Sequence, residues 1–127
     1  MAWTSFLKNL IGGESSDTET LETEGGNGPR NENLSGRAFK KQLEETENAV
    51  LLDVRTAGEF AGGTIPGSKN IDFLNPTFAK KVEGLKKDAT YFVFCRSGNR
   101  SGSACKMMHK MGFDVRNLSG GIGSFPG

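Results

Sequence analysis

The sequence predicts a single α/β domain with a mainly parallel central sheet and helices on both faces of that sheet. Two observations support this prediction. From residue 35 onward, short apolar runs alternate with helix-like segments, and this alternation is typical of parallel strands joined by helices. The chain has 127 residues, a length that suits one domain, and its hydrophobic content of 35% is low because a polar segment dilutes it.

The first half of the alternation contains two expected helices and two expected strands. Residues 35–46 are expected to form a helix, because their two large apolar residues fall on one side. Residues 50–54 form a continuous apolar run that predicts a buried strand. A short helix is expected at 56–61, before a pair of glycines, and a strand at 71–74.

The second half repeats the pattern. A helix is expected at 77–85, directly after Pro76, and a central strand at 90–95. Residues 101–111 carry a helical apolar stripe that ends before a glycine, and 114–118 are expected to form the last strand. Because the carboxyl ends of parallel strands meet at one edge of the sheet, the functional site is expected at that edge.

The strongest functional signal is a cysteine, Cys95, at the end of the apolar run. A short polar loop follows it and consists of Arg96, Ser97, Gly98, Asn99, Arg100 and Ser101. A thiol is a good nucleophile only as a thiolate, and a strand-to-helix turn with two guanidinium groups favours that anion. Gly98 suits the positive φ of such a turn, and Ser101 stands where an N-cap would start the next helix.

Cys95 has an alternative interpretation as a buried cysteine at a strand end, with Arg96 and Arg100 as ordinary surface charges. Its position favours the reactive interpretation. The residue lies where the hydrophobic run stops and the polar loop begins, so the thiol is expected at the edge of the sheet, where thiols are reachable.

Three motifs follow one another along the chain: Leu51-Leu52-Asp53-Val54-Arg55 continuing to Ile65-Pro66-Gly67-Ser68, then Cys95-Arg96-Ser97-Gly98-Asn99-Arg100-Ser101, then Leu118-Ser119-Gly120-Gly121-Ile122. They resemble, in the same order, the landmarks of the rhodanese family of sulfurtransferases. The resemblance covers the chain from about residue 34 to residue 127. It implies a rhodanese-like domain whose cysteine carries sulfur as a persulfide. No cofactor and no metal are expected.

Two positions depart from the family pattern. Rhodaneses commonly have His where this chain has Thr64, and Trp where it has Phe125. The first change removes a side chain that usually supports the site, and the second keeps an aromatic plug.

Asp53, Arg55 and Glu59 are expected to support the site rather than to act as acid or base. Asp53 is placed at a strand end, where it can accept loop N–H groups or pair with an arginine, and Arg55 is expected to reach Glu59 four residues on. The resemblance implies the same, because the corresponding Asp and Arg of the family brace the active-site loop. A thiolate of low pKa requires no dedicated base.

The resemblance implies transfer of sulfane sulfur from a small anionic donor such as thiosulfate to a thiophilic acceptor through a Cys95 persulfide. Cyanide serves as acceptor in an assay, and a thiol or a partner protein is expected in the cell. One alternative is a persulfide carrier or a regulatory or redox module with little turnover. Phosphatase or arsenate reductase activity is less favoured, because four residues separate Cys95 from Arg100, whereas those related enzymes have five.

The chain before the domain divides into two parts. Residues 1–11 form an amphipathic segment, whose apolar residues recur at the spacing of one helix face. This segment lacks the features of a secretory signal and is too short to span a bilayer. Contact with a membrane, a partner, another copy or its own domain stays open, although nothing specifically supports membrane contact. Residues 12–33 are expected to form a flexible acidic linker, and 34–127 the folded domain.

Charge separates these parts. Residues 34–127 carry 14 Lys and Arg against 9 Asp and Glu, a net charge of +5, whereas 12–33 are acidic. A mildly basic domain favours small anions. The basic residues are scattered without interleaved aromatic residues, so nucleic-acid binding is not expected.

The two cysteines and the single histidine have separate expected roles. Cys105 falls on the apolar stripe of its helix and is expected to be core, and His109 is expected on the surface of the last helical turn. No Cys and His set has zinc spacing. Two cysteines without an export signal are typical of a reducing cytoplasm, which is the expected location.

Overall fold

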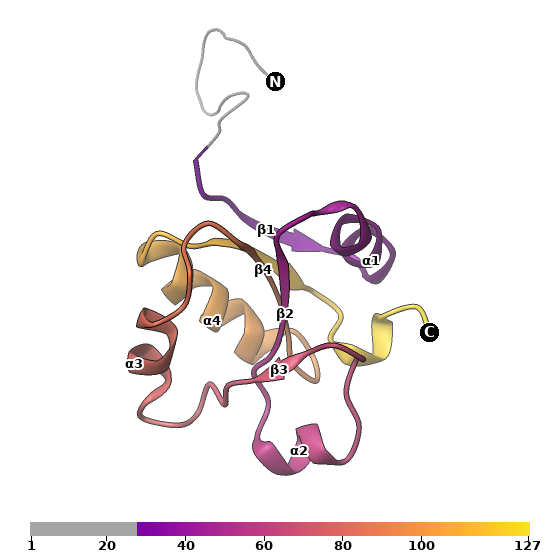
Figure 1. Cartoon of the computed structure of the whole chain (residues 1–127). Helices are drawn as coiled ribbons and strands as arrows, with labels where there is room; N and C mark the ends of the chain where they lie inside the picture. The colour runs from indigo at the N-terminus through magenta and orange to yellow at the C-terminus, as the bar shows by residue number, and fades with distance from the viewer. Residues whose placement is uncertain (1–27) are drawn as a thin grey trace, which may run out of the picture.

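Within residues 28–127, which the computed structural model describes, five strands form one parallel sheet in the order β1-β5-β4-β2-β3 (Figure 1). The strands are β1 (Asn31–Leu34), β2 (Ala49–Asp53), β3 (Lys69–Asn70), β4 (Thr90–Phe94) and β5 (Asp114–Leu118). The predicted amphipathic segment 1–11 and most of the predicted linker lie outside the described residues.

Helices cover both faces of this sheet (Figure 1). They are α1 (Gly36–Glu45), α2 (Ala57–Ala61), α3 (Phe78–Glu83), α4 (Asn99–Lys110) and the short 3-10 turn η2 (Ile122–Ser124). One buried cluster joins the sheet to α3 and α4, and a second joins it to α1 and η2. The prediction of a mainly parallel α/β sheet with helices on both faces is therefore confirmed.

The central strand β4 sends its side chains alternately to the two clusters. Tyr91 and Val93 belong to the cluster on the α4 side, and Phe92 and Phe94 to the cluster on the α1 side. This is the period of two expected of a strand that is buried on both faces. Cys95 continues the first set, so its side chain lies on the α4 side at the carboxyl end of β4.

Strand β1 begins at Asn31, inside the segment 12–33 that was expected to be linker. It pairs with β5 from Asn31 opposite Val115 to Leu34 opposite Leu118. The prediction missed it because β1 is a short edge strand with three polar residues, and an edge strand needs little apolar character to hydrogen-bond to its neighbour.

The strand expected at 71–74 is wrong, because β3 is the two-residue strand Lys69–Asn70. The apolar residues that suggested a strand do pack against the core, as partly buried Ile71 and Phe73. Their backbone N–H groups donate to the carbonyl oxygens of Asp53 and Val54, each at 3.0 Å, so the chain follows the end of β2 without forming a regular ladder.

The helices of residues 28–127 are all too short and too polar to cross a membrane. The predicted cytoplasmic location is not tested by that observation and stays a prediction.

Candidate functional site

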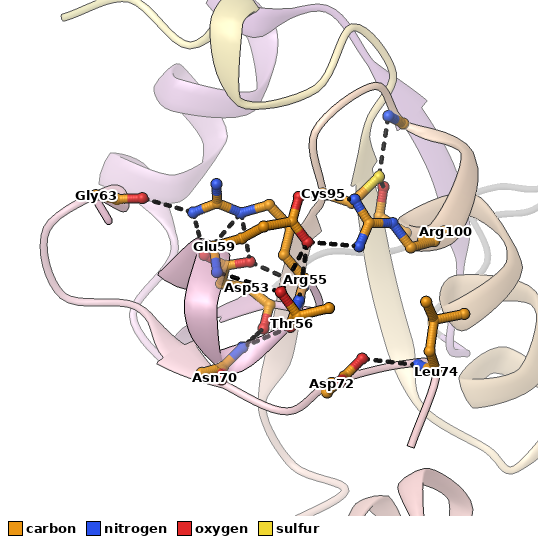
Figure 2. Close-up of polar contacts among 12 residues, drawn as sticks. Asp53, Arg55, Thr56, Glu59, Gly63, Asn70, Asp72, Leu74, Cys95 and Arg100 are labelled. Atoms are coloured by element: carbon orange, nitrogen blue, oxygen red, sulfur yellow. Dashed lines mark hydrogen bonds and ion pairs between the residues drawn. The ribbon is translucent and has the colours of Figure 1, made fainter. Parts of the chain in front are cut away.

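Cys95 lies at the carboxyl end of β4, as predicted, but it is completely buried rather than reachable from solvent as its position at the end of the apolar run suggested. Its Sγ accepts a hydrogen bond from the Gly98 N–H at 3.1 Å and one from the Ser101 Oγ at 3.3 Å. Figure 2 shows the sulfur pointing into the turn that leads into α4. The loop that follows the cysteine therefore curls around its own sulfur atom.

The surroundings of Cys95 favour the thiolate. Burial by itself raises the pKa of the Cys95 thiol, but hydrogen bonds from the Ser101 hydroxyl and from the backbone N–H groups of Ser101, Ser97 and Gly98 lower it. The second effect is larger, so the pKa lies below its ordinary value. Cys95 thus differs from an inert core cysteine, for which burial alone sets the pKa.

The turn around Cys95 depends on two glycines with positive φ. Gly98 has φ of 98° and is the N-cap residue of α4, and a Cβ atom there would collide with the Ser119 carbonyl. Gly121 has φ of 77°, and a Cβ atom there would collide with the Arg96 carbonyl. Glycine at both positions lets the segment after β5 pack directly against the Cys95 loop.

Arg100, in the first turn of α4, is paired with Glu59 of α2. Its guanidinium donates to both carboxylate oxygens, at 2.8 and 3.1 Å (Figure 2). Hydrogen bonding to Arg100 and to Thr56 lowers the pKa of Glu59 to about 2. Thr56 and Glu59 also form a capping box at the start of α2. The ion pair therefore fixes the Cys95 loop to a helix that follows β2.

Asp53 and Arg55 form a second, buried pair at the end of β2. The Arg55 guanidinium donates to both Asp53 carboxylate oxygens, with a shortest distance of 2.7 Å, and to the Gly63 carbonyl at 2.6 Å. The backbone N–H of Arg55 also donates to Asp53 Oδ1 at 3.0 Å. Hydrogen bonding to Asp53 raises the pKa of Arg55. The pair closes the turn between β2 and α2.

Two further residues complete this support, and the sequence did not identify their contacts. Thr64 Oγ1 donates to Asp53 Oδ2 at 2.9 Å. Asn70 Nδ2 donates to the carbonyl oxygens of Asp53 and Arg55, each at 2.9 Å (Figure 2). The only sequence signal that marks Asn70 is its position as a polar residue directly before apolar Ile71 and Phe73. Thr64 thus supplies a hydrogen bond at the position where the family commonly has His.

Two expected contacts differ in the structure. Ser101 is not the N-cap residue, because the positive φ of Gly98 starts the helix at Asn99, and the Ser101 hydroxyl instead faces Cys95. Arg55 does not reach Glu59 through a helical turn, because α2 begins only at Ala57. Arg55 pairs with Asp53, and Glu59 pairs with Arg100.

The remaining loop residues face solvent. Arg96, Ser97 and Asn99 are exposed, and within residues 28–127 the Arg96 side chain has no hydrogen bond or ion pair. Arg96 is therefore the loop residue whose positive charge is not paired with a carboxylate within residues 28–127. The structure brings together Cys95, Gly98, Arg100 and Ser101, with Glu59 bound to Arg100.

Cys105 and His109 lie where the sequence placed them. Cys105 is buried in the cluster under α4, and burial raises the pKa of its thiol to about 12. His109 is exposed in the last turn of α4, and one of its ring nitrogens lies 3.2 Å from the Pro29 carbonyl. Among the described residues, no group of three or more His, Cys, Asp and Glu side chains is placed to hold a metal ion.

Comparison with known proteins agrees with this geometry. Residues 35–125 match the rhodanese-like domain family. YtwF of Bacillus subtilis is 37% identical over 94 residues, which cover 74% of this chain and 89% of YtwF. Thiosulfate sulfurtransferase GlpE of Pseudomonas putida strain GB-1 is 38% identical over 82 residues, covering 64% of this chain and 73% of GlpE.

A solved structure gives the same result for the fold. A rhodanese-like domain protein from Staphylococcus aureus superposes with a TM-score of 0.66 at 27% identity, over 75% of this chain and 91% of that protein. The parallel sheet, the loop that curls around Cys95 and the matched residues 35–125 lead to one conclusion: the chain belongs to the rhodanese-like domain family.

Proposed function

We propose that the protein is a sulfurtransferase that moves sulfane sulfur from a small anionic donor such as thiosulfate to a thiophilic acceptor through a Cys95 persulfide. The observation that carries this proposal is the set of hydrogen-bond donors around the Cys95 sulfur, which lowers the pKa of the thiol despite its burial. Membership of the rhodanese-like family and similarity to thiosulfate sulfurtransferase GlpE support it.

In the first step, the Cys95 thiolate attacks the outer sulfur of thiosulfate. The new bond joins the Cys95 sulfur to that outer sulfur, while the bond between the two thiosulfate sulfurs breaks. Its electron pair leaves with sulfite, and a Cys95 persulfide anion remains. No proton is transferred, so this step requires no dedicated base.

The loop stabilises the persulfide by the same contacts that favour the thiolate. The N–H groups of Ser97, Gly98 and Ser101 and the Ser101 hydroxyl surround the sulfur, so they also face negative charge on the persulfide. Arg96 attracts the incoming donor from the exposed side of the loop. Arg100, held by Glu59, keeps the start of α4 in place and adds a partly neutralised positive charge.

In the second step, the acceptor removes the outer sulfur. Cyanide forms a bond to that sulfur and the persulfide bond breaks, which releases thiocyanate and regenerates the Cys95 thiolate. A low-molecular-weight thiol or a protein thiolate performs the same attack and becomes a persulfide. Cys95 and Cys105 are both free thiols, and we place the reaction in a reducing compartment such as the cytoplasm.

The experiment that tests this function is thiocyanate release from thiosulfate and cyanide, measured on the full chain. The wild type is expected to turn over many times, and Cys95→Ser to lose activity. Cys105→Ala is the matched control, because Cys105 is a buried thiol of raised pKa, and this variant is expected to keep most of the activity. Full activity in Cys95→Ser would contradict the proposal.

The persulfide carrier is the second candidate, since the surroundings of Cys95 stabilise a persulfide whether or not it is passed on rapidly. Single loading of Cys95 with slow release to cyanide or to small thiols would identify a carrier. A phosphatase is disfavoured by the four-residue spacing and by the pairing of Arg100 with Glu59, which occupies the guanidinium that an oxyanion would need. Hydrolysis of an aryl phosphate that depends on Cys95 would reverse this choice.

A further inference from the structure

An open, mainly apolar hollow lies beside the carboxyl end of the sheet, between α1, the loop after α2 and the end of the chain. Its volume is about 470 Å³. The apolar part of its lining comes from Ile65, Pro66, Ile122, Phe125 and Pro126. Lys40 of α1 also lines it, and its ammonium nitrogen lies 5.9 Å from the centroid of the Phe125 ring. The described residues leave this hollow unfilled.

The walls of the hollow are attached to the site around Cys95. The Ile122 N–H donates to the Cys95 carbonyl at 2.8 Å. On the other wall, Thr64 donates to the Asp53 carboxylate. A segment that fills the hollow therefore contacts Ile122, which is bonded to the Cys95 backbone, and Thr64, which is bonded to Asp53 at the end of β2.

The same chain contains an apolar segment that suits this hollow. Residues 1–11 include five large apolar side chains at the spacing of one helix face, namely Trp3, Phe6, Leu7, Leu10 and Ile11. Burial of such side chains in an apolar environment is favourable. Binding of this segment to an apolar surface is therefore favourable, and the question is which surface it contacts.

Length and charge favour the surface of its own domain. The 16 residues 12–27 that separate the segment from Gly28 span at most roughly 50–60 Å, well above the radius of gyration of about 13 Å expected for a domain of this size. They carry five acidic residues and no basic one, whereas residues 28–127 carry 15 Lys and Arg against 10 Asp and Glu, a net charge of +5. The acidic stretch is attracted to the domain, and Lys40 places one of these positive charges at the hollow.

Two other surfaces that residues 1–11 could contact, a membrane and a second copy of the chain, are less favourable. A membrane surface of anionic lipids repels the acidic stretch, and Lys8 is the single basic residue within 1–11. A second copy competes at its bulk concentration, whereas a tethered segment has an effective concentration in the millimolar range. Intramolecular docking is thus favoured at micromolar protein.

We propose that residues 3–11 dock into the hollow lined by Ile65, Ile122 and Phe125, with the acidic residues that follow them lying near Lys40. The docked segment packs against one wall that is bonded to the Cys95 backbone and one that is bonded to Asp53. The docking is independent of the reaction at Cys95, so its test does not depend on sulfur transfer.

Trp3 is the single tryptophan of the chain, so its fluorescence reports on this segment directly. In the full chain, Trp3 is expected to emit at shorter wavelength and with higher anisotropy than a solvent-exposed tryptophan. Both values are expected to be independent of protein concentration in the micromolar range. Lys40→Glu is expected to move the emission toward that of exposed tryptophan. Lys80→Glu, on the exposed side of α3, makes the same change of net charge away from the hollow and is expected to have no effect.

Three outcomes would overturn the proposal. Solvent-like Trp3 emission in the full chain would show that the segment does not dock. A blue shift that grows with protein concentration, accompanied by a larger mass in light scattering, would assign the segment to a second copy. A blue shift that occurs only with vesicles of anionic phospholipid would assign it to a membrane.

A second measurement locates the docking site. The double substitution of Leu7→Asp and Leu10→Asp in the full chain removes the apolar face and keeps Trp3 as the reporter. It is expected to shift the backbone amide resonances of Ile65, Ile122 and Phe125, while the resonances of α3 stay unchanged. Shifts confined to other surfaces, or none at all, would contradict docking in this hollow.

Discussion

The Arg100 guanidinium donates to both carboxylate oxygens of Glu59, at 2.8 and 3.1 Å, and so joins the first turn of α4 to α2. The two residues are 41 positions apart in the sequence. Through this pair, the position of the loop around Cys95 depends on the turn after β2. The Glu59 carboxylate therefore has two roles, because it pairs with Arg100 and also accepts hydrogen bonds from Thr56 in the cap of α2.

Glu59→Gln is expected to reduce the dependence of stability on acid pH. Since folding lowers the pKa of Glu59 from 4.5 to about 2, its contribution is present above pH 4.5 and is lost as the pH falls from 4.5 toward 2. Arg100 and Glu59 keep 24% and 29% of their side-chain exposure, so solvent screens the pair, and we expect a contribution of about 1 kcal/mol. Denaturant unfolding at several pH values measures it.

The matched control for that experiment is Glu83→Gln at the exposed end of α3. Gln at position 59 keeps the shape and one acceptor oxygen for the capping box, and it removes the charge together with one of the two oxygens that accept from Arg100. An equal acid-dependent loss of stability in the wild type and in Glu59→Gln would contradict the assignment.

Ser101→Ala is expected to raise the pKa of the Cys95 thiol. The variant removes the hydroxyl that donates to Sγ at 3.3 Å, and this hydrogen bond is the largest of the contacts that lower the pKa. Because the thiolate is the nucleophile, the acid limb of the pH–rate profile is expected to move to higher pH. The rate of Cys95 alkylation, measured against pH, reports the same shift without any assumption about the substrate.

Ser103→Ala is the control for Ser101→Ala, since Ser103 lies on the exposed side of the same helix. An alkylation profile that is identical for Ser101→Ala and the wild type would show that the hydroxyl does not tune the thiol.

Gly98→Ala is expected to destabilise the fold and to impair the site. The φ of 98° is unfavourable for alanine, and the new Cβ atom would collide with the Ser119 carbonyl. We expect a loss of about 2–4 kcal/mol from the combined strain and overpacking. Gly123→Ala is the comparison, because its Cβ atom would meet nothing within 4 Å. Similar unfolding free energies for the two variants would refute the packing described for the Cys95 loop.

Thr64→Val and Thr64→Ser separate the hydroxyl of this residue from its size. Valine removes the donor to Asp53 Oδ2, and we expect a destabilisation of about 1–3 kcal/mol. Serine keeps a hydroxyl and is expected to restore most of that loss. Thermal unfolding of the three proteins measures the difference, and equal stability of the valine variant and the wild type would show that the hydrogen bond contributes little.

The sequence predicted the features that depend on local pattern. The apolar run that ends on Cys95 gave both the central strand and the position of the cysteine, because a strand buried on both faces reads as a continuous apolar stretch. The spacing of apolar residues along α4 also predicted that Cys105 belongs to the core. Features of this kind require only the neighbours along the chain.

The sequence did not predict the partners of the charged residues. The pairing of Glu59 with Arg100 depends on where the fold places α2 relative to the start of α4, which no local pattern encodes. The edge strand β1 and the two-residue strand β3 were missed because hydrogen bonding to a formed neighbour, rather than apolar alternation, stabilises each of them. Ser101 was misplaced as a cap because the helix start depends on the backbone conformation of Gly98.

The most direct test of sulfur transfer is the intact mass of the full chain before and after thiosulfate, and again after cyanide, with Cys95→Ser treated in parallel. Our account predicts that the wild type alone gains one sulfur atom and loses it to cyanide as thiocyanate is released. The same gain on Cys95→Ser, or no gain on the wild type, would contradict a Cys95 persulfide as the intermediate.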